Sequence, residues 1–231
     1  MAWRCTGNTN AELIANMAAN GIISSARVTK AMAKVDRANY VRNKLTAYED
    51  SPQTIGHGAT ISAPHMHAYA AEHLIDFLKP GAKVLDVGSG SGYLSAVLHY
   101  LVSDDITSGK VVGIDHIQEL VDYSIENLKK DNLSDALESK HIEVIVGDGR
   151  QGYSVGGPYD AIHVGAAAPT LPQALVDQLA SPGRMFIPVG SGVQYILHID
   201  KDEQGNVTQS QVMGVNYVPL TDLERQRASA W

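Results

Sequence analysis

Short apolar runs alternate with longer amphipathic segments from Val84 onward. The runs KVLDV, VVGID, IEVIVGD, YDAIHVGA and GRMFIPVG are rich in β-branched residues. In the intervening segment IQELVDYSIENLKK, Leu120, Ile125 and Leu128 fall roughly on one helical face. Apolar runs that alternate with helices are typical of a parallel sheet covered on both faces. The pattern therefore predicts an α/β fold of the doubly wound kind.

The last part of the chain has a different pattern. Two strand-like runs, VQYILHID and the run ending in VMGVNYVPL, are joined around Gly205 and Asn206. This arrangement predicts an antiparallel hairpin added to an otherwise parallel sheet. Just before it, a helix is expected over about 171–179 and a strand over the GRMFIPVG run.

Residues 10–80 are expected to form a mostly helical cover, with a loop over about 48–63. Pro64 suits the first turn of a helix, where its missing N–H costs little. We expect that helix to end at the KPG sequence of residues 79–81. Four apolar residues recur on one of its faces, namely Met66, Ala70, Leu74 and Leu78.

Composition narrows the class of protein. The chain has 231 residues, of which 44% are hydrophobic and 19% charged, which suits one soluble domain. We expect a single domain, with 1–80 as the cover, 81–190 as the core and 191–231 as the hairpin and tail. The net charge of −7 argues against a general nucleic-acid binder. The single cysteine, Cys5, and the lack of long apolar stretches predict a cytosolic protein without a membrane partner.

The sequence VLDVGSGSGYL is the strongest motif in the chain. A buried strand is followed by Gly88, Gly90 and Gly92, and glycine loops at this end of a parallel strand bind ligands in doubly wound folds. The spacing is G-x-G-x-G, because Tyr93 stands where the dinucleotide fingerprint needs a third glycine. With Asp86 two residues before Gly88 and no phosphate-loop lysine, the motif favours a nucleoside-type cofactor. The alternative is a glycine-rich turn without a ligand.

Acidic residues end the next two predicted strands. Asp115 closes VVGID, where a carboxylate can accept hydrogen bonds from a ribose diol. Asp148 and Gly149 follow IEVIV and are placed to meet an exocyclic amine such as that of adenine. Any one of these acids could be a solvated loop residue, but their positions at successive strand ends favour a cofactor site.

The stretch GHGATISAPHMHA, residues 56–68, holds three histidines and one serine, Ser62. A metal site built on His57, His65, His67 and His73 is disfavoured, because their spacing does not match structural zinc sites. A hydrolase nucleophile is disfavoured as well, because no G-x-S-x-G surrounds Ser62. We expect polar or surface roles for His65 and His73, and no metal.

At this point the chain resembles the class I S-adenosylmethionine-dependent methyltransferases, and among them the protein-L-isoaspartate (D-aspartate) O-methyltransferases. The resemblance runs from about Glu12 to Gln226 and rests on ATISAPHMHA, LDVGSGSGYL, VVGIDHIQELV, IVGDGRQGY, DAIHVGAAAP and VNYVPLTDLERQ. It implies a Rossmann-like, mostly parallel seven-stranded sheet. It also implies transfer of a methyl group from S-adenosylmethionine, leaving S-adenosylhomocysteine, to the free carboxyl of isoaspartyl and some D-aspartyl residues in damaged proteins. Succinimide formation from the ester would then lead back to aspartate.

The resemblance also assigns residues. Ser62 matches the active-site serine and is expected to orient the acceptor carboxylate. Because a carboxyl group is already ionised at neutral pH, the reaction needs no general base. Together the motifs and the resemblance give these cofactor contacts: Ala59, Thr60, Ile61, Ser62, His67, Asp86, Gly88, Gly90, Ser91, Gly92, Asp115, His116, Asp148, Gly149, Thr221 and Gln226.

The VGAAAPTLP stretch suggests where the substrate lies. Small alanines leave room for an extended peptide beside Ala166, Ala167, Val215 and Val218, together with Ser62; alternatively, the alanines simply pack beneath a helix. Two other functions stay open at this point, a methyltransferase acting on a small-molecule or RNA hydroxyl and a non-catalytic S-adenosylmethionine-binding module. We expect a monomer, because no assembly segment is evident.

Overall fold

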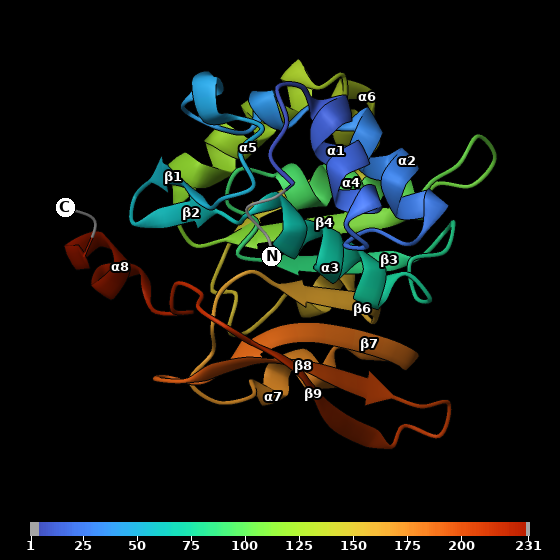
Figure 1. The fold of residues 1–231 in the computed structure, drawn as a ribbon. Coiled ribbons are helices and arrows are strands. Elements are labelled where there is room, and N and C mark those ends of the chain that lie inside the picture. The colour runs from blue at the N-terminus through green and yellow to red at the C-terminus, as the bar shows by residue number, and fades with distance from the viewer. Residues whose placement is uncertain (1–4, 230–231) are drawn as a thin grey trace.

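The structure, a computed structural model, describes residues 5–229 and contains one seven-stranded sheet with the order β5-β4-β3-β6-β7-β8-β9 (Figure 1). Strands β3 to β7 of this sheet are parallel, and β8 and β9 add an antiparallel hairpin. The predicted doubly wound, mostly parallel sheet with a C-terminal hairpin is therefore confirmed. The strands are β3 (Lys83–Val87), β4 (Lys110–Asp115), β5 (Ile142–Val146), β6 (Tyr159–Val164), β7 (Leu179–Val189), β8 (Gln194–Lys201) and β9 (Val207–Val215).

Strand β3 is the point where the sheet changes direction. It pairs in parallel with β4 on one side and with β6 on the other. The connection after β3 therefore leads to one half of the sheet, and the connection after β5 leads to the other half. A crevice opens between them at the carboxyl ends of the strands. The glycine loop lies at this crevice.

The helices surround the sheet, with most of the N-terminal ones on the same side as α4 (Figure 1). Contacts of α1 with α2, and of α2 with α4, join the predicted N-terminal cover to the sheet. The helices are α1 (Asn10–Ala19), α2 (Ala26–Lys34), α3 (Pro64–Leu74), α4 (Tyr93–Val102), α5 (Gln118–Lys130), α6 (Ser134–Glu138), α7 (Gln173–Asp177) and α8 (Leu223–Ser229), with 3-10 turns η2 (Arg37–Asn39), η3 (Lys44–Thr46) and η4 (Ser154–Gly156).

Consecutive strand residues belong to different sides of the core. Val84 and Val111 join the large cluster formed with α1 to α5, whereas Leu85 and Val112 join a second cluster that includes Leu175 of α7. Side chains alternate across a strand, so a strand that is apolar at every position must be buried on both faces. The continuous apolar runs of the sequence have this cause.

Three sequence predictions differ from the structure in detail. The expected loop over 48–63 contains a small antiparallel sheet of β1 (Gln53–Gly56) and β2 (Ala59–Ile61). Its turn is made by His57 and Gly58, which both have positive φ and so behave like a two-residue hairpin turn. The helix after Pro64 ends at Leu74 rather than at 79–81, because tighter i to i+3 turns replace it before the proline. The helix expected over 171–179 spans only Gln173–Asp177, since Leu179 already begins β7.

Candidate active site

The glycine loop connects β3 to α4 with a left-handed backbone at each of its three glycines. Gly88, Gly90 and Gly92 have φ values of +72°, +51° and +83°. Side chains disfavour this conformation, which explains the spacing of the motif. The backbone N–H groups of Gly88 and Ser89 donate to the carbonyl of Ile114, 2.8 and 3.2 Å away. The loop is therefore held against the end of β4.

Asp115, at the end of β4, is fixed by backbone donors. Its two carboxylate oxygens accept hydrogen bonds from Gly90 N at 3.2 Å and from Ile117 N at 3.0 Å. Burial nevertheless raises the pKa of Asp115, because a charged carboxylate loses hydration there. A carboxylate that is oriented in this way can still accept hydrogen bonds from a ligand in the crevice.

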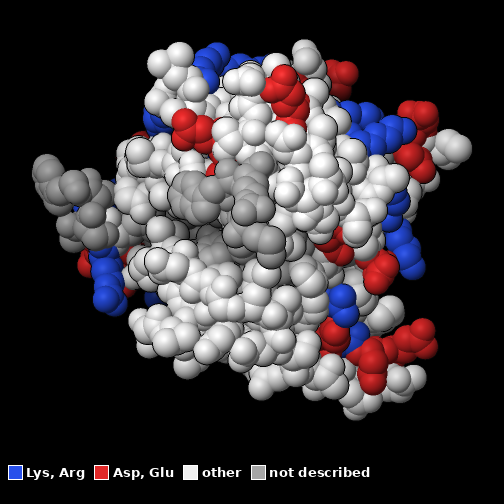
Figure 2. Space-filling view, viewed as in Figure 1, with Lys and Arg blue, Asp and Glu red and all other residues white. Residues whose placement is uncertain are grey.

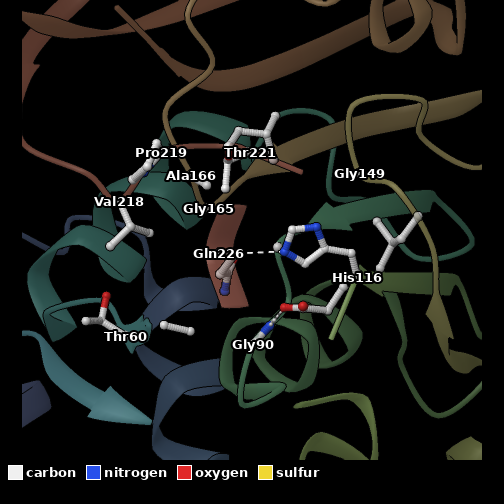
Figure 3. A pocket seen from close by; sticks show the side chains of 15 residues that line it. Thr60, Gly90, His116, Gly149, Gly165, Ala166, Val218, Pro219, Thr221 and Gln226 are labelled. Atoms are coloured by element: carbon white, nitrogen blue, oxygen red, sulfur yellow. Dashed lines mark hydrogen bonds between the residues drawn. The ribbon is translucent and has the colours of Figure 1, made fainter. Parts of the chain in front are cut away.

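The C-terminal helix α8 reaches over this crevice. Gln226 Oε1 lies 2.6 Å from His116 Nε2, and Gln226 Nε2 donates to the His57 carbonyl at 3.0 Å (Figure 3). Gln226 thus joins the strand end at His116 to the β1–β2 turn, 110 and 169 residues away in sequence. These hydrogen bonds form a clasp at the edge of the crevice.

We call the space beneath this clasp the cofactor pocket. It has a volume of about 60 Å³ and is narrow, with glycine backbone on several sides (Figure 3). Asp148 does not line it; Arg150 binds both Asp148 oxygens, at 2.9 and 2.8 Å, and lowers the pKa of that carboxyl. The pocket is lined by Ala59, Thr60, Gly88, Gly90, Ile114, Asp115, His116, Gly149, Gly165, Ala166, Val218, Pro219, Leu220, Thr221 and Gln226.

A second, smaller space adjoins the glycine loop, and we call it the polar cavity. Three buried polar atoms of residues that line it lack a hydrogen-bond partner among residues 5–229: His67 Nδ1, Ser89 Oγ and Tyr93 Oη. Buried polar atoms are rarely left unpaired, so these atoms are suited to a polar ligand group. The cavity is lined by Thr60, Ile61, Ser62, His67, Asp86, Gly88, Ser89, Gly90, Ser91, Tyr93, Leu94, His163 and Gly165.

A buried chain of hydrogen bonds supports one wall of the polar cavity. Asp86 and His163 face each other in register on β3 and β6, and His163 Nδ1 lies 2.8 Å from Asp86 Oδ1. The other Asp86 oxygen accepts from Ser95 Oγ at 2.6 Å. This contact fixes the ring of His163. His67, on another wall of this cavity, is buried, and burial holds its pKa well below the usual value. The charge of Arg37 lowers this pKa further, so His67 is neutral at pH 7.

Ser62 lies where the polar cavity meets the outside. Its backbone carbonyl accepts a hydrogen bond from Arg37 Nη2 at 2.9 Å. Arg37 is fully buried, and burial lowers its pKa to about 10, so it remains cationic at neutral pH. A buried positive charge behind Ser62 favours an anionic acceptor in front of it.

On the other side of Ser62 lies a much larger space, the outer groove. It has a volume of about 620 Å³ and runs between the start of α3 and the carboxyl end of β9. Thr60 and Ser62 face both this groove and the polar cavity. The outer groove is lined by Ile22, Pro52, Thr60, Ser62, Ala63, His65, Met66, Tyr69, Met213, Gly214, Val215, Asn216, Tyr217 and Val218.

Most of the sequence-predicted residues meet at these three spaces, with a few exceptions. Gly92 lines none of them; a Cβ there would lie 3.1 Å from Ser124 Cβ, so its role is close packing. Asp148 is bound by Arg150, and Ala167 is 2% exposed, with its backbone hydrogen-bonded to Val218 and Leu220. Ligand contacts of Gly92, Asp148 and Ala167 therefore stay predictions.

Local motifs did not indicate the roles of several residues in or beside these three spaces. His163 stands in the quoted motif DAIHVGAAAP, but only strand register shows that it meets Asp86, 77 residues earlier. Arg37 has no local motif. His65 faces the outer groove rather than simply covering the helix surface. Across residues 5–229, no group of three His, Cys, Asp or Glu side chains is arranged to hold a metal ion.

Comparisons with known proteins agree on one family. The sequence profile described as Protein-L-isoaspartate(D-aspartate) O-methyltransferase (PCMT) matches residues 8–225. Protein-L-isoaspartate O-methyltransferase 1 of Arabidopsis thaliana is 48% identical over 95% of this chain and 94% of its own. Protein-L-isoaspartate O-methyltransferase of Caenorhabditis elegans is 49% identical over 98% of each chain. A PCMT crystal structure from Plasmodium falciparum, in complex with S-adenosyl-L-homocysteine, has a TM-score of 0.86 at 36% identity and covers 93% of this chain and 99% of that one.

Proposed function

The chain belongs to the protein-L-isoaspartate (D-aspartate) O-methyltransferase family, and from this premise we propose how its cleft carries out the reaction. The protein is an S-adenosylmethionine-dependent methyltransferase that methylates isoaspartyl residues of proteins, as its family and relatives indicate. The alternative of a hydroxyl acceptor has no support in these comparisons. Action on D-aspartyl residues and the return to aspartate through a succinimide belong to the proposal.

The fit of the cofactor to the cleft rests on the unpaired atoms of the polar cavity. The amino-acid end of S-adenosylmethionine carries both an ammonium and a carboxylate group. The unpaired Ser89 Oγ and Tyr93 Oη can donate or accept, and His67 Nδ1 adds a further polar contact, so the cavity can satisfy such an end. The adjoining cofactor pocket would hold the nucleoside, with Asp115 on the ribose. This complementarity of buried polar groups is the observation that carries the proposed site.

The proposed site residues keep the roles expected of them. Asp115, His116, Thr221 and Gln226 would hold the nucleoside, whereas Ser62 and His67 adjoin the amino-acid end. Because Asp148 is engaged by Arg150, Gly149 is the residue of this strand end that faces the pocket. An adenine contact by Asp148 would require Arg150 to share the carboxylate.

The chemistry needs charge and alignment more than proton transfer. When bound, S-adenosylmethionine supplies a methyl group on a positively charged sulfur. The protein's part is to hold an anionic carboxylate in line with that methyl, in a place from which water is excluded. The Ser62 hydroxyl can donate to the carboxylate, and the Arg37 cation behind it favours the negative charge. His67, which is neutral, adds no repulsion to the positive sulfur.

The substrate peptide would reach Ser62 along the outer groove. Val215 and Val218 line this groove, and Ala166 lies at the cofactor pocket beside Val218. Ala167 supports the path indirectly, because its N–H donates to the Val218 carbonyl at 2.8 Å. We place the extended peptide along residues 215–218 for this reason.

The same proposal covers the protein's setting. No helix within residues 5–229 is long and apolar enough to cross a membrane. The net charge of −7 and the single cysteine support action in the cytosol on protein substrates rather than on nucleic acid. A monomer organised as a single domain is part of the same proposal.

A matched pair of peptides tests the function. One peptide carries isoaspartate and the other aspartate at the same position, and each is incubated with the protein and methyl-labelled S-adenosylmethionine. We expect base-labile label on the isoaspartyl peptide alone, because a methyl ester hydrolyses in base. Label on neither peptide, or base-stable label, would contradict the proposed reaction.

A further inference from the structure

A further pocket lies outside the proposed cleft, between residues 38–44 and helix α5, and we call it the basic pocket. It has a volume of about 250 Å³ and shares no lining residue with the cofactor pocket, the polar cavity or the outer groove. The proposed methyl transfer makes no use of it. A ligand bound there would therefore be distinct from both the cofactor and the peptide.

The lining of the basic pocket carries positive charge only. Arg42, Lys44 and Lys130 line it, whereas no Asp or Glu does, although the chain has 25 acidic and 18 basic residues. On the face that Figure 2 shows, Lys and Arg side chains lie among Asp and Glu side chains around the margins. A pocket with three cations is therefore a local exception, and its field attracts anions.

Two acidic side chains near the basic pocket neutralise little of this charge. Glu126 Oε2 lies 3.9 Å from Lys130 Nζ, and both side chains are more than half exposed, so solvent screens this pair. Asp131 does not line the pocket, and its oxygens accept from Asn39 Nδ2 at 2.7 Å and from Tyr40 Oη at 3.0 Å. The lining therefore keeps a net positive charge.

Arg42 is fixed on one side and open on the other. Its Nε donates to the Ile55 carbonyl at 2.7 Å, and its guanidinium carbon lies 4.4 Å from the centre of the Tyr123 ring. Among residues 5–229, its Nη groups have no hydrogen-bond or ion-pair partner. A guanidinium that is oriented in this way and has free N–H groups suits a phosphate or a carboxylate.

Asn127 adds a buried polar group to the lining. It is fully buried, its Nδ2 donates to the Ser91 carbonyl at 3.1 Å, and its Oδ1 has no hydrogen-bond partner among residues 5–229. The Ser91 carbonyl needs a donor, which fixes the end of the amide that carries the nitrogen. The remaining oxygen only accepts, so a ligand that satisfies it must bring an O–H or N–H group as well as negative charge.

We propose that the basic pocket is a regulatory site for a small phosphorylated ligand. Its phosphate group lies between Arg42, Lys44 and Lys130, and one of its hydroxyl groups donates to Asn127 Oδ1. A phosphate monoester carries nearly two negative charges at neutral pH and offers three acceptor oxygens, which matches three cations better than a carboxylate does. The volume of the pocket is slightly below that of drug-sized ligand sites, so the ligand is small.

The same residues connect the basic pocket with the glycine loop. Asn127 is hydrogen-bonded to Ser91 of that loop, and Arg42 is hydrogen-bonded to Ile55. The side chain of Ile55 packs on Gly90, where an added Cβ would lie 3.2 Å from Ile55 Cδ1. A ligand that holds Arg42 and Asn127 in place should therefore stabilise the loop and strengthen cofactor binding. This coupling rests on the proposed function, whereas the phosphate site itself does not.

Calorimetry of the whole protein with inorganic phosphate tests the site, with sulfate as the matched anion at equal ionic strength. Phosphate at mildly alkaline pH is a dianion that keeps one P–OH group, whereas sulfate is a dianion without a donor. We expect saturable binding of phosphate with an affinity at least three-fold above that of sulfate. Phosphate that does not saturate would overturn the site, and equal affinity for sulfate would overturn the role of Asn127.

Two substitutions and a control locate the binding. Arg42→Gln should weaken phosphate binding about ten-fold, and Lys44→Gln about three-fold, as the loss of charge-assisted hydrogen bonds predicts. Lys44 is exposed and is not part of the proposed cleft, so Lys44→Gln should retain the wild-type melting temperature and methylation rate in the absence of phosphate. The control is Lys79→Gln, because Lys79 is exposed and does not line the pocket. Equal weakening in the control would reduce the effect to overall charge and overturn the site.

The affinity for S-adenosylhomocysteine tests the coupling. We expect it to rise about five-fold in saturating phosphate, and the affinity for phosphate to rise by the same factor in saturating S-adenosylhomocysteine. Lys44→Gln should shift the phosphate concentration needed for this effect, and Lys79→Gln should not. Phosphate that binds without changing this affinity would overturn the regulatory role. If S-adenosylhomocysteine does not bind at all, the proposed function fails, and the phosphate titration alone decides the site.

Discussion

The cleft has two halves on either side of Ser62, and they differ in width and polarity. The cofactor side is narrow and polar, with donors and acceptors fixed by strand ends and by a glycine backbone. The outer groove is wide and uncharged, with walls of methionine, tyrosine and aliphatic side chains. The narrow cofactor side suits one molecule of fixed structure. The wide outer groove suits peptides of many different sequences. A repair enzyme whose substrate arises in many sequence contexts needs both.

Ser62 is where a single change should have the largest effect on rate. Ser62→Ala removes the hydroxyl that we propose orients the carboxylate, and we expect kcat to fall about 100-fold, as for the loss of one preorganised donor. The dissociation constant of S-adenosylhomocysteine should change by less than about three-fold, since most cofactor contacts remain. Single-turnover kinetics and calorimetry measure the two quantities. Equal losses in both would show that Ser62 serves the cofactor side instead.

A change at Asp115 should affect cofactor affinity much more than the reaction with the peptide, which is the reverse of the effect expected at Ser62. Asp115→Ala removes the proposed ribose acceptor and its hydrogen bonds to Gly90 and Ile117. We expect affinity for S-adenosylhomocysteine to fall about 30-fold, as the loss of hydrogen bonds to a charged group predicts. KM for the isoaspartyl peptide at saturating cofactor should stay nearly constant. A large change in peptide KM with unchanged cofactor affinity would contradict the division of the cleft.

The clasp formed by Gln226 should have a smaller effect. Gln226→Ala removes its hydrogen bonds to His116 and the His57 carbonyl. We expect cofactor dissociation to become about five-fold faster in stopped-flow experiments, because two partly exposed hydrogen bonds contribute modestly. Glu224→Ala, in the exposed first turn of the same helix, is the control. An equal change in both variants would indicate a general effect on α8.

Acid should weaken cofactor binding by a few-fold. Burial raises the pKa of Asp115 above 3.8, and protonation removes its ability to accept on both oxygens. The ionised form is the binding form, so affinity should be present at neutral pH and decline as the pH falls through the raised pKa. Calorimetry at successively lower pH below neutrality should show this decline in affinity. Asp115→Asn should show a flatter profile; the same slope in both would assign the titration to another group.

The sequence was most informative where the candidate site residues stand in short local motifs. The three glycines, Asp115 and Ser62 stand in short motifs, because a tight turn and a strand end need particular residues at particular positions. The apolar runs that alternate with helical segments predicted the sheet for a similar reason, since burial on both faces of a strand favours apolar residues at most of its positions.

Contacts between distant segments could not be predicted in the same way. The pairing of Asp86 with His163 depends on the register of β3 against β6, and the support of Ser62 by Arg37 depends on how η2 packs. The outer groove joins α3 to β9, and nothing in either segment alone indicates the other. His65 makes a polar contact, as expected, but its partner, buried Asp50, lies outside the motif and could not be predicted from it.

A structure of the protein with S-adenosylhomocysteine and an isoaspartyl peptide would test the central claim most directly. The account predicts that the isoaspartyl carboxylate accepts a hydrogen bond from Ser62 Oγ and that the peptide lies along residues 215–218. A peptide bound elsewhere, or one whose carboxylate points away from Ser62, would contradict it.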